Sequence, residues 1–169
     1  IMKNIHHYKN KDYVKDIFDN AYKNYDLMND IMSLGSHRLW KHEFVNSIDL
    51  DLNHKIVDMA SGTGDISKLV LKKNKNQNIY RIEPNFNMLN HTISKFSKFQ
   101  KVINICSYAE NIPLRCGTID TYMISFGLRN FTKIDCAIDE AFRVLKSGGS
   151  FVCLEFYIVN NPLVKNFYS

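Results

Sequence analysis

One stretch of the sequence combines two acidic residues with two closely spaced glycines. The stretch reads Asp58-x-Ala60-x-Gly62-x-Gly64-Asp65, with an apolar run before it and a helical apolar pattern after it. Glycines let the backbone approach a ligand closely, and the free N–H groups at a helix start face that ligand. The stretch therefore predicts a nucleotide-type cofactor at a strand-to-helix turn.

The cofactor expected at this turn is S-adenosylmethionine and not a dinucleotide. The dinucleotide fingerprint G-x-G-x-x-G needs glycines where this chain has Ala60 and Ser67. Adenosylmethionine lacks a pyrophosphate and carries an ammonium and a sulfonium group, which suit the acidic Asp58 and Asp65. The alternative is an ordinary strand-to-helix turn without a ligand.

A second acidic position supports the adenosyl cofactor. Glu83 closes the next apolar run about 20 residues beyond the loop, where a carboxylate can accept hydrogen bonds from both ribose hydroxyls. The alternative is a surface carboxylate that is favourable at the start of any helix because of the helix dipole.

The elements that must position these residues alternate between strand and helix patterns. Apolar runs predict strands at 56–60, 79–82, 102–105, 119–125 and 151–157. Helical patterns separate them, and the last, over 134–145, is expected to end at Gly148-Gly149. Strict alternation predicts an α/β fold with a Rossmann-like, doubly wound parallel sheet, which binds ligands at the carboxyl ends of its strands. The polar tract 72–78 predicts a solvated loop.

The chain is expected to divide into an N-terminal helical segment, 1–50, and a cofactor-binding core, 51–169. Helical patterns cover 12–32 and 39–48, with Ser36 as an N-cap for the second. Asn161-Pro162 ends the fifth strand, and we expect the core to stop before its last strands. The resulting exposed sheet edge predicts pairing with another chain, for example in a homodimer.

Composition narrows the classes of function. The 169 residues, 45% of them hydrophobic, suit one domain, and a net charge of +5 with scattered lysines fits a solvated surface, an anionic membrane or a nucleic acid. The 4 cysteines and 6 histidines lack the spacing of metal ligands, so we expect no metal. No apolar run approaches the roughly 18 residues that span a bilayer, so the protein is expected to be soluble or peripheral.

Longer motifs in the chain resemble those of the UbiE-type ubiquinone/menaquinone C-methyltransferases. The matching runs are Tyr25-Asp26-x-Met28-Asn29 through Trp40-Lys41, Asp58 through Asp65, Phe126-Gly127-Leu128-Arg129-Asn130, and Arg143 through Gly149 followed by Leu154-Glu155-Phe156. The resemblance implies a class I methyltransferase with a seven-stranded sheet. It also implies methyl transfer from S-adenosylmethionine to a ring carbon of a polyprenylated benzoquinol or naphthoquinol, with S-adenosylhomocysteine as the second product.

The resemblance adds cofactor contacts to the loop residues and Glu83. It places Thr63, Tyr108, Ala109 and Ser125 against the cofactor. The chain departs from the family pattern at five positions, where the family usually has glycine, aspartate, asparagine, proline and serine; these are Ser61, Glu83, Tyr108, Ser147 and Tyr157. Tyr108 is the departure that matters most, because its ring could stack on the adenine instead of hydrogen-bonding it.

The residues expected to be catalytic lie after the fourth strand and in the N-terminal region; they are Arg129, Asn130 and His37. In the family the N-terminal region covers the active site, so His37, Arg38 and Trp40 are expected in a lid over the quinol. A guanidinium beside a phenol lowers its pKa and favours the ionised ring that attacks the methyl group, which makes Arg129 the first choice for chemistry. The alternative is that Arg129 braces its loop through carbonyl contacts.

Two rival functions share this fold. A nucleic-acid methyltransferase commonly carries Asn/Asp-Pro-Pro-aromatic or a Pro-Cys nucleophile, but this chain has Ile124-Ser125-Phe126-Gly127 after the fourth strand, so we expect no nucleic-acid partner. A non-catalytic subunit of a quinone-synthesis complex stays open. The quinol implies a peripheral membrane location, which is the matrix side of the mitochondrial inner membrane in a eukaryote and the cytoplasmic side in a bacterium.

Overall fold

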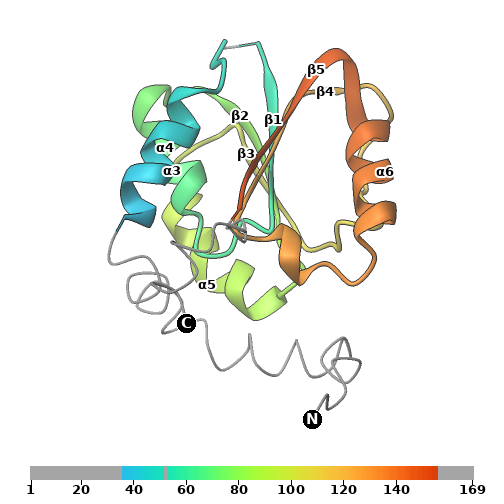
Figure 1. The fold of residues 1–169 in the computed structure, drawn as a ribbon. Helices are drawn as coiled ribbons and strands as arrows, with labels where there is room; N and C mark the ends of the chain where they lie inside the picture. Colours follow the sequence, from blue (N-terminus) through green and yellow to red (C-terminus); the bar gives the residue numbers. More distant parts are fainter. Residues whose placement is uncertain (1–35, 52, 156–169) are drawn as a thin grey trace, which may run out of the picture.

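The computed structural model describes residues 36–51 and 53–155, which form a single parallel sheet with helices on both faces (Figure 1). The elements are α3 (His37–Asn46), β1 (Lys55–Met59), α4 (Asp65–Lys73), β2 (Asn78–Ile82), α5 (Phe86–Phe96), β3 (Val102–Ile105), β4 (Ile119–Ser125), the short 3-10 helix η2 (Leu128–Asn130), α6 (Ile134–Val144) and β5 (Leu145–Leu154). The five strands pair in the order β3-β2-β1-β4-β5, all parallel. The predicted Rossmann-like α/β fold is confirmed. The helical pattern at 12–32 lies outside the described residues.

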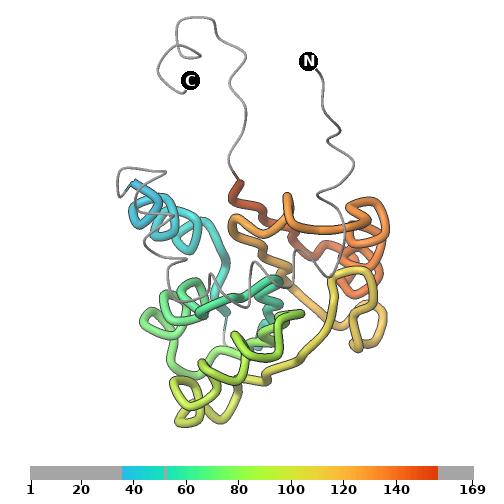
Figure 2. Tube along the Cα trace, turned by 90° about the horizontal axis from the view of Figure 1, so that it is seen from below, coloured from blue at the N-terminus to red at the C-terminus, as the bar shows by residue number. Residues whose placement is uncertain are grey.

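Two apolar clusters cover the two faces of the sheet. On one face α3, α4 and α5 pack against the strands through a buried cluster that includes Val45, Val70 and Phe96. On the other face α6 packs through Ala137 and Val144. Figures 1 and 2 both show the blue-to-green helices and the orange α6 on opposite sides of the sheet. Strands covered on both faces must be apolar along nearly their whole length, which explains the continuous runs seen in the sequence.

The polar tract 72–78 is the predicted solvated loop only in part: Lys75 and Asn76 form an exposed turn before β2, but the ends of the tract differ. Lys72 and Lys73 form the last turn of α4, and Gln77 is completely buried. The Gln77 side-chain amide donates to the carbonyl oxygens of Asp51, at 3.1 Å, and His54, at 2.7 Å. A buried amide with satisfied hydrogen bonds fixes the approach to β1, a role that composition cannot distinguish from solvation.

The end of the last helix also differs from the prediction. The helix stops at Val144, and β5 begins at Leu145 instead of continuing as helix to the glycine pair. The carbonyl oxygens of Arg143 and Val144 accept hydrogen bonds from the N–H groups of Gly117 and Thr118, both at 2.9 Å. Because these neighbours satisfy the last turn, the helix needs no glycine cap. The glycine pair instead lies where the β4–β5 register shifts.

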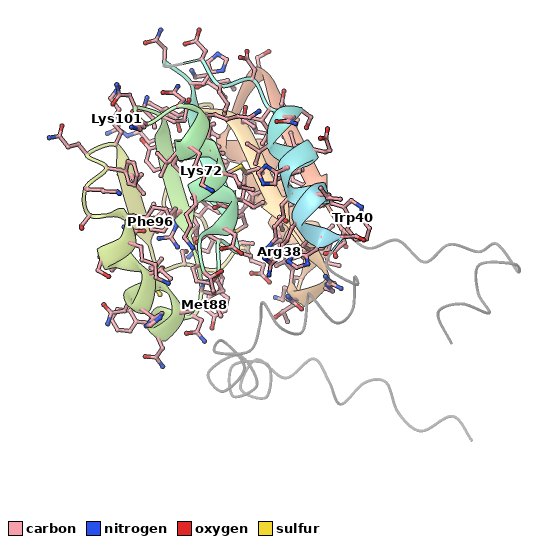
Figure 3. All side chains as sticks on the ribbon, turned by 90° about the vertical axis from the view of Figure 1, so that its left-hand side faces the viewer. Arg38, Trp40, Lys72, Met88, Phe96 and Lys101 are labelled. Carbon is pink, nitrogen blue, oxygen red and sulfur yellow. The ribbon has the colours of Figure 1, made fainter. Side chains whose placement is uncertain are left out.

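The glycine at the start of α4 is required by space as well as by conformation. Gly64 has a left-handed φ of +80°, and a Cβ built there would lie 2.6 Å from the ring of Phe96 and 3.0 Å from Nη2 of Arg81. The first turn of α4 therefore rests directly on the Phe96 ring. Figure 3 labels Phe96 and Met88 toward opposite ends of α5 on this side of the molecule.

A matched pair of glycines separates these two constraints. Gly148 has φ +79°, almost equal to that of Gly64, but a Cβ there would meet nothing within 4 Å. We expect Gly148→Ala to lower the free energy of unfolding by about 1–2 kcal/mol, the cost of a left-handed residue. Gly64→Ala should lose about 1–3 kcal/mol more through overpacking, as measured by urea unfolding. Equal losses in the two variants would contradict the packing role of Gly64.

Candidate active site

A cavity of about 400 Å³ opens at the carboxyl edge of the sheet, where the strand order predicts a ligand. Figure 2 views the structure from below in Figure 1. The cavity is lined by residues at and beyond the ends of β1, β2, β3 and β4, together with one residue of α3; they are Lys41, Asp58 to Thr63, Asp65, Ile66, Glu83 to Met88, Tyr108 to Glu110, Ser125 to Gly127 and Asn130 to Thr132.

Backbone hydrogen bonds continue beyond the strands and hold this edge in register. The N–H of Ser61 donates to the carbonyl of Ile82 at 3.1 Å, and the N–H of Glu83 donates to the carbonyl of Ile105 at 3.0 Å. Each strand end is therefore tied to the next strand in the sheet. Side chains at these positions are fixed relative to one another by the sheet itself.

The ends of β1 and β4 turn sharply at non-glycine residues. Ala60 has φ +53° and Phe126 has φ +54°, both in the left-handed region. Gly127 lies against the first of these turns, because a Cβ built on it would be 2.7 Å from Cβ of Ala60. These two tight turns form adjacent parts of the cavity wall, and residues held in such conformations cluster at functional sites.

Glu83 directly follows β2 and binds the loop between β1 and α4, residues 60–64, which we call the glycine loop. Its Oε2 accepts the N–H of Gly62 at 2.8 Å, and its Oε1 accepts the N–H of Asn85 at 3.0 Å. The side chain is only 6% exposed, and burial raises the pKa of Glu83 above its usual value. Each carboxylate oxygen has a further lone pair that a ligand hydroxyl can use.

Asp58 is buried at the end of β1 and also borders the cavity. Its Oδ2 accepts the hydroxyl of Ser67 at 2.5 Å. Burial raises the pKa of Asp58 to about 6, against the lowering effect of the Ser67 hydrogen bond and of Arg81. The group is therefore mostly ionised at neutral pH and titrates just below it.

Asp65, the other acid of the loop, already has cationic partners. Nζ of Lys41 lies 3.0 Å from Oδ2 of Asp65, and Nζ of Lys68 lies 3.3 Å from Oδ1. Although burial opposes them, these lysines lower the pKa of Asp65 below its usual value. Its charge is neutralised within the protein, which leaves Asp58 as the better partner for a ligand ammonium.

Most of the predicted cofactor residues line this one cavity. They are Asp58, Gly62, Thr63, Asp65, Glu83, Tyr108, Ala109 and Ser125. Gly64 is the exception, because it faces Phe96 and Arg81 behind the loop. Of the predicted catalytic residues only Asn130 lines the cavity.

His37 and Arg129 lie outside the cavity. His37 is 3% exposed and borders a smaller hollow between α3 and α4. The sequence predicts this residue in a lid over the quinol. Lys41, one helical turn further along the same face, is the residue of α3 that reaches the cavity. Nη2 of Arg129 lies 3.0 Å from Oε1 of Glu155, which also accepts the backbone N–H of Arg129 through Oε2 at 3.3 Å.

Two residues of the site were missed by the sequence reasoning. Lys41 stood inside the quoted N-terminal motif, but no spacing argument connected it to Asp65. Arg81 lies within the predicted strand 79–82 and is completely buried against the loop. An arginine in an otherwise apolar strand, two positions before Glu83, was the available signal.

Comparison with known proteins identifies the family. The sequence model of the ubiE/COQ5 methyltransferase family matches residues 6–169. The chain belongs to this family. The proteins called ubiquinone/menaquinone biosynthesis C-methyltransferase UbiE in Rickettsia prowazekii and Rickettsia typhi are each 43% identical to it, over 173 and 162 residues. These alignments cover 98% and 92% of this chain but 69% and 65% of the Rickettsia proteins, so the chain spans about two thirds of their length.

Solved structures of low sequence identity share the fold of this UbiE-family chain. The YcgJ protein of Bacillus subtilis aligns with a TM-score of 0.65 at 19% identity, covering 75% of this chain and 54% of YcgJ. A SAM-dependent methyltransferase of Aquifex aeolicus aligns with a TM-score of 0.60 at 18% identity, covering 90% of this chain and 78% of that protein. The cyclase SpnF aligns with a TM-score of 0.67 at 22% identity, covering 76% and 49%. A fold that also serves a cyclase does not define the reaction, so the chemistry must be argued from the site.

The donors around the cavity fit S-adenosylmethionine, the cofactor of the family. The hydroxyls of Ser61 and Ser125 are buried beside the cavity and have no hydrogen-bond partner among the described residues. Buried polar atoms without partners are rare, and a polar ligand would satisfy both. Within residues 36–51 and 53–155 no cluster suits a metal ion, and no helix is long and apolar enough to cross a membrane.

The pKa of Asp58 predicts how cofactor binding depends on pH. Its carboxylate attracts a ligand ammonium only above pH 6 or so, since burial raises its pKa to about 6. The affinity for S-adenosylhomocysteine should therefore rise about tenfold from about pH 5 to about pH 7. Folding stability should respond in the opposite direction, because a raised carboxyl pKa favours the protonated folded state between the unfolded and folded pKa values.

Asp58→Asn is the control, because it keeps an acceptor for Ser67 and removes the charge. Calorimetry should show weaker binding by this variant at about pH 7 and a flatter dependence on pH. An equally steep pH dependence in Asp58→Asn would assign the titration to another group.

Proposed function

We propose that this chain transfers a methyl group from S-adenosylmethionine to a ring carbon of a polyprenylated benzoquinol or naphthoquinol. The observation that carries the proposal is the cavity at the carboxyl edge, where Asp58, Glu83 and the glycine loop converge in a chain of the UbiE family. The names of the Rickettsia relatives support the same reaction. When bound, adenosylmethionine supplies the methyl group as an electrophile.

Three groups of this chain are proposed to hold the cofactor. Glu83 accepts from the ribose hydroxyls, Asp58 attracts the ammonium, and Tyr108 stacks on the adenine. Tyr108 lines the cavity and is 46% exposed, so its ring is accessible to a ligand. The hydroxyls of Ser61 and Ser125 gain partners when the cavity fills. Because these groups are fixed by strand ends, little has to move on binding.

The quinol is proposed to bind beside the loop that follows β4. Residues 130–132 of this loop line the cavity, and the Arg129–Glu155 ion pair anchors the loop from behind. This arrangement favours the alternative in which Arg129 braces its loop, with the Glu155 carboxylate as one partner. Asn130 is then the residue of this loop that faces the substrate.

The acceptor ring needs an ionised phenol for carbon attack. With a phenolic pKa near 10, only about one molecule in 10³ is ionised at neutral pH, a cost of roughly 4 kcal/mol. Polar groups that line the cavity, including Lys41 and Asn130, can stabilise the phenolate or orient the water that accepts its proton. Positioning the ring carbon against the methyl group supplies the remaining acceleration.

The proposed reaction is tested by a methyl-transfer assay. The protein is incubated with methyl-labelled S-adenosylmethionine and short-chain benzoquinol and naphthoquinol analogues, and NMR locates the label. We expect label on a ring carbon of at least one analogue and none on oxygen. Cofactor binding without transfer to either analogue would favour a non-catalytic subunit, and absence of cofactor binding would remove the proposal entirely.

The role of Arg129 is tested by removing each partner of its ion pair. If the pair positions the loop, Arg129→Ala and Glu155→Ala should each lower kcat about 10- to 100-fold, the size of a small misplacement. The double variant should be no slower than either single variant, because one interaction is lost in all three.

The pH profile then separates bracing from direct chemistry. Bracing predicts the same loss in both variants at every pH. If kcat recovers in Arg129→Ala but not in Glu155→Ala as the pH approaches the phenolic pKa, Arg129 instead assists phenol ionisation.

The proposed cellular setting is a membrane surface that carries the quinol. A polyprenyl substrate is held in the bilayer, so the protein must bind there peripherally to reach it. The Rickettsia relatives are bacterial proteins. The mitochondrial location, the homodimer and a quinone-synthesis complex stay predictions from the sequence.

A further inference from the structure

Arg81 is a buried cation that the proposed mechanism does not use. It lies on β2 with 0% exposure and is the largest fully buried side chain of the described residues. A buried guanidinium without compensation is costly by several kcal/mol, so its surroundings must stabilise it. The nature of those surroundings indicates what the residue does.

The direct partners of Arg81 are neutral groups. Nη1 donates to Oδ1 of Asn104 at 2.8 Å, and Nη2 donates to Oγ1 of Thr92 at 2.9 Å. The guanidinium carbon lies 3.9 Å from the centre of the Phe96 ring, a favourable cation–π distance. These contacts orient the guanidinium but leave its charge without a directly paired carboxylate among the described residues.

The same guanidinium contacts the glycine loop but does not line the cavity. Nη2 also donates to the carbonyl oxygen of Gly62 at 3.4 Å, while the N–H of Gly62 donates to Glu83 at 2.8 Å. Both polar backbone atoms of Gly62 are therefore bonded to side chains, the carbonyl to Arg81 on β2 and the N–H to Glu83 directly after β2. The space that a side chain at Gly64 would occupy is filled by Arg81 and Phe96.

Arg81 is the register partner of Asp58 across the β1–β2 pair and lies two residues before Glu83, so its charge acts on both carboxylates of the site. Asp58 is surrounded by the Ser67 hydroxyl, Arg81 and the like charge of Asp65, and burial outweighs the lowering effect of Arg81 on its pKa. Glu83 is surrounded by the N–H groups of Gly62 and Asn85, by Asp58 and by Arg81. Arg81 is the cation that lowers the pKa of both groups.

We propose that Arg81 is a positioning residue that fixes the glycine loop through Gly62. From outside the cavity it also balances the negative charges of Asp58 and Glu83. The proposal rests on the proposed function only in treating these carboxylates as cofactor ligands. The contact of Arg81 with the glycine loop is made in the protein without a cofactor. The two parts can therefore be tested separately.

The first test measures the loop in the ligand-free protein. Hydrogen exchange of the 61–65 amides is compared in wild type, Arg81→Met and Ile79→Val. Ile79 is buried two residues earlier on the same face of β2, so its variant is a control for lost core packing. We expect at least about tenfold faster exchange in Arg81→Met and wild-type exchange in Ile79→Val. Equal exchange in both variants would overturn the positioning role.

The second test measures charge through S-adenosylhomocysteine binding. In Arg81→Met the pH of half-maximal affinity should move up by about one unit, as expected on losing a nearby opposite charge. Arg81→Lys should restore that pH while the loop amides still exchange faster than in wild type, because lysine keeps the charge and loses the planar fork. An unchanged pH midpoint in Arg81→Met would overturn the charge role.

A third variant keeps the proposal testable if Arg81→Met fails to fold. Thr92→Val removes one acceptor of Arg81 but leaves its charge, and Thr92 lies outside the cavity. It should speed exchange of the loop amides about threefold or more and leave the pH midpoint unchanged. Wild-type exchange in this variant would count against the proposal. If wild type does not bind S-adenosylhomocysteine, the proposed function fails while the exchange test of Arg81 still stands.

Discussion

Three charged side chains are buried together at the carboxyl edge of the sheet, and the site depends on their mutual compensation. Asp58, Arg81 and Glu83 are 2%, 0% and 6% exposed. Removing such groups from water costs several kcal/mol each unless hydrogen bonds and opposite charges replace the lost hydration. Ser67, Asn104, Thr92 and backbone N–H groups supply the hydrogen bonds. Arg81 lies on β2 and Glu83 directly follows it, so one short segment supplies both signs of charge.

Arg143, which begins one of the family motifs, acts on the frame of the site and does not line the cavity. Nη2 of Arg143 donates to Glu140 at 2.7 Å and to the carbonyl of Ile112 at 2.8 Å, while Nη1 donates to the carbonyl of Leu114. This fork fastens the β3–β4 connection to α6, and the cavity residues 108–110 belong to that connection. A motif that marks a family can therefore hold a loop in place without touching a ligand.

The sequence predicts the alternating elements well because apolar periodicity reports directly on burial. β3 and β4 have the predicted bounds, and α6 begins where the apolar pattern begins. The end of α6 was wrong because Gly117 and Thr118, distant in sequence, satisfy its last carbonyls. Gln77 was placed in solvent because a buried amide and a solvated amide look alike in composition.

The site was predicted less completely than the fold, for a related reason. Glu83 and the glycine loop follow from local spacing, and both line the cavity. The Lys41–Asp65 and Arg129–Glu155 pairs join segments separated by 24 and 26 residues, so no local pattern connects their members. Arg81 contacts Asn104 on the neighbouring strand and Thr92 on a helix, and only the three-dimensional packing reveals that combination.

The close approach of the two strand-end turns has a consequence for how this sequence can change. Only one methyl group fits between residues 60 and 127, because a Cβ on Gly127 would lie 2.7 Å from that of Ala60. A glycine at 60 would free that space and also remove the left-handed strain at φ +53°. The two positions should therefore exchange in a compensated way among relatives, with alanine at 127 accepted only where 60 is glycine. The order of the two substitutions then matters. Ala60→Gly can come first, whereas Gly127→Ala in the presence of Ala60 places two Cβ atoms in conflict.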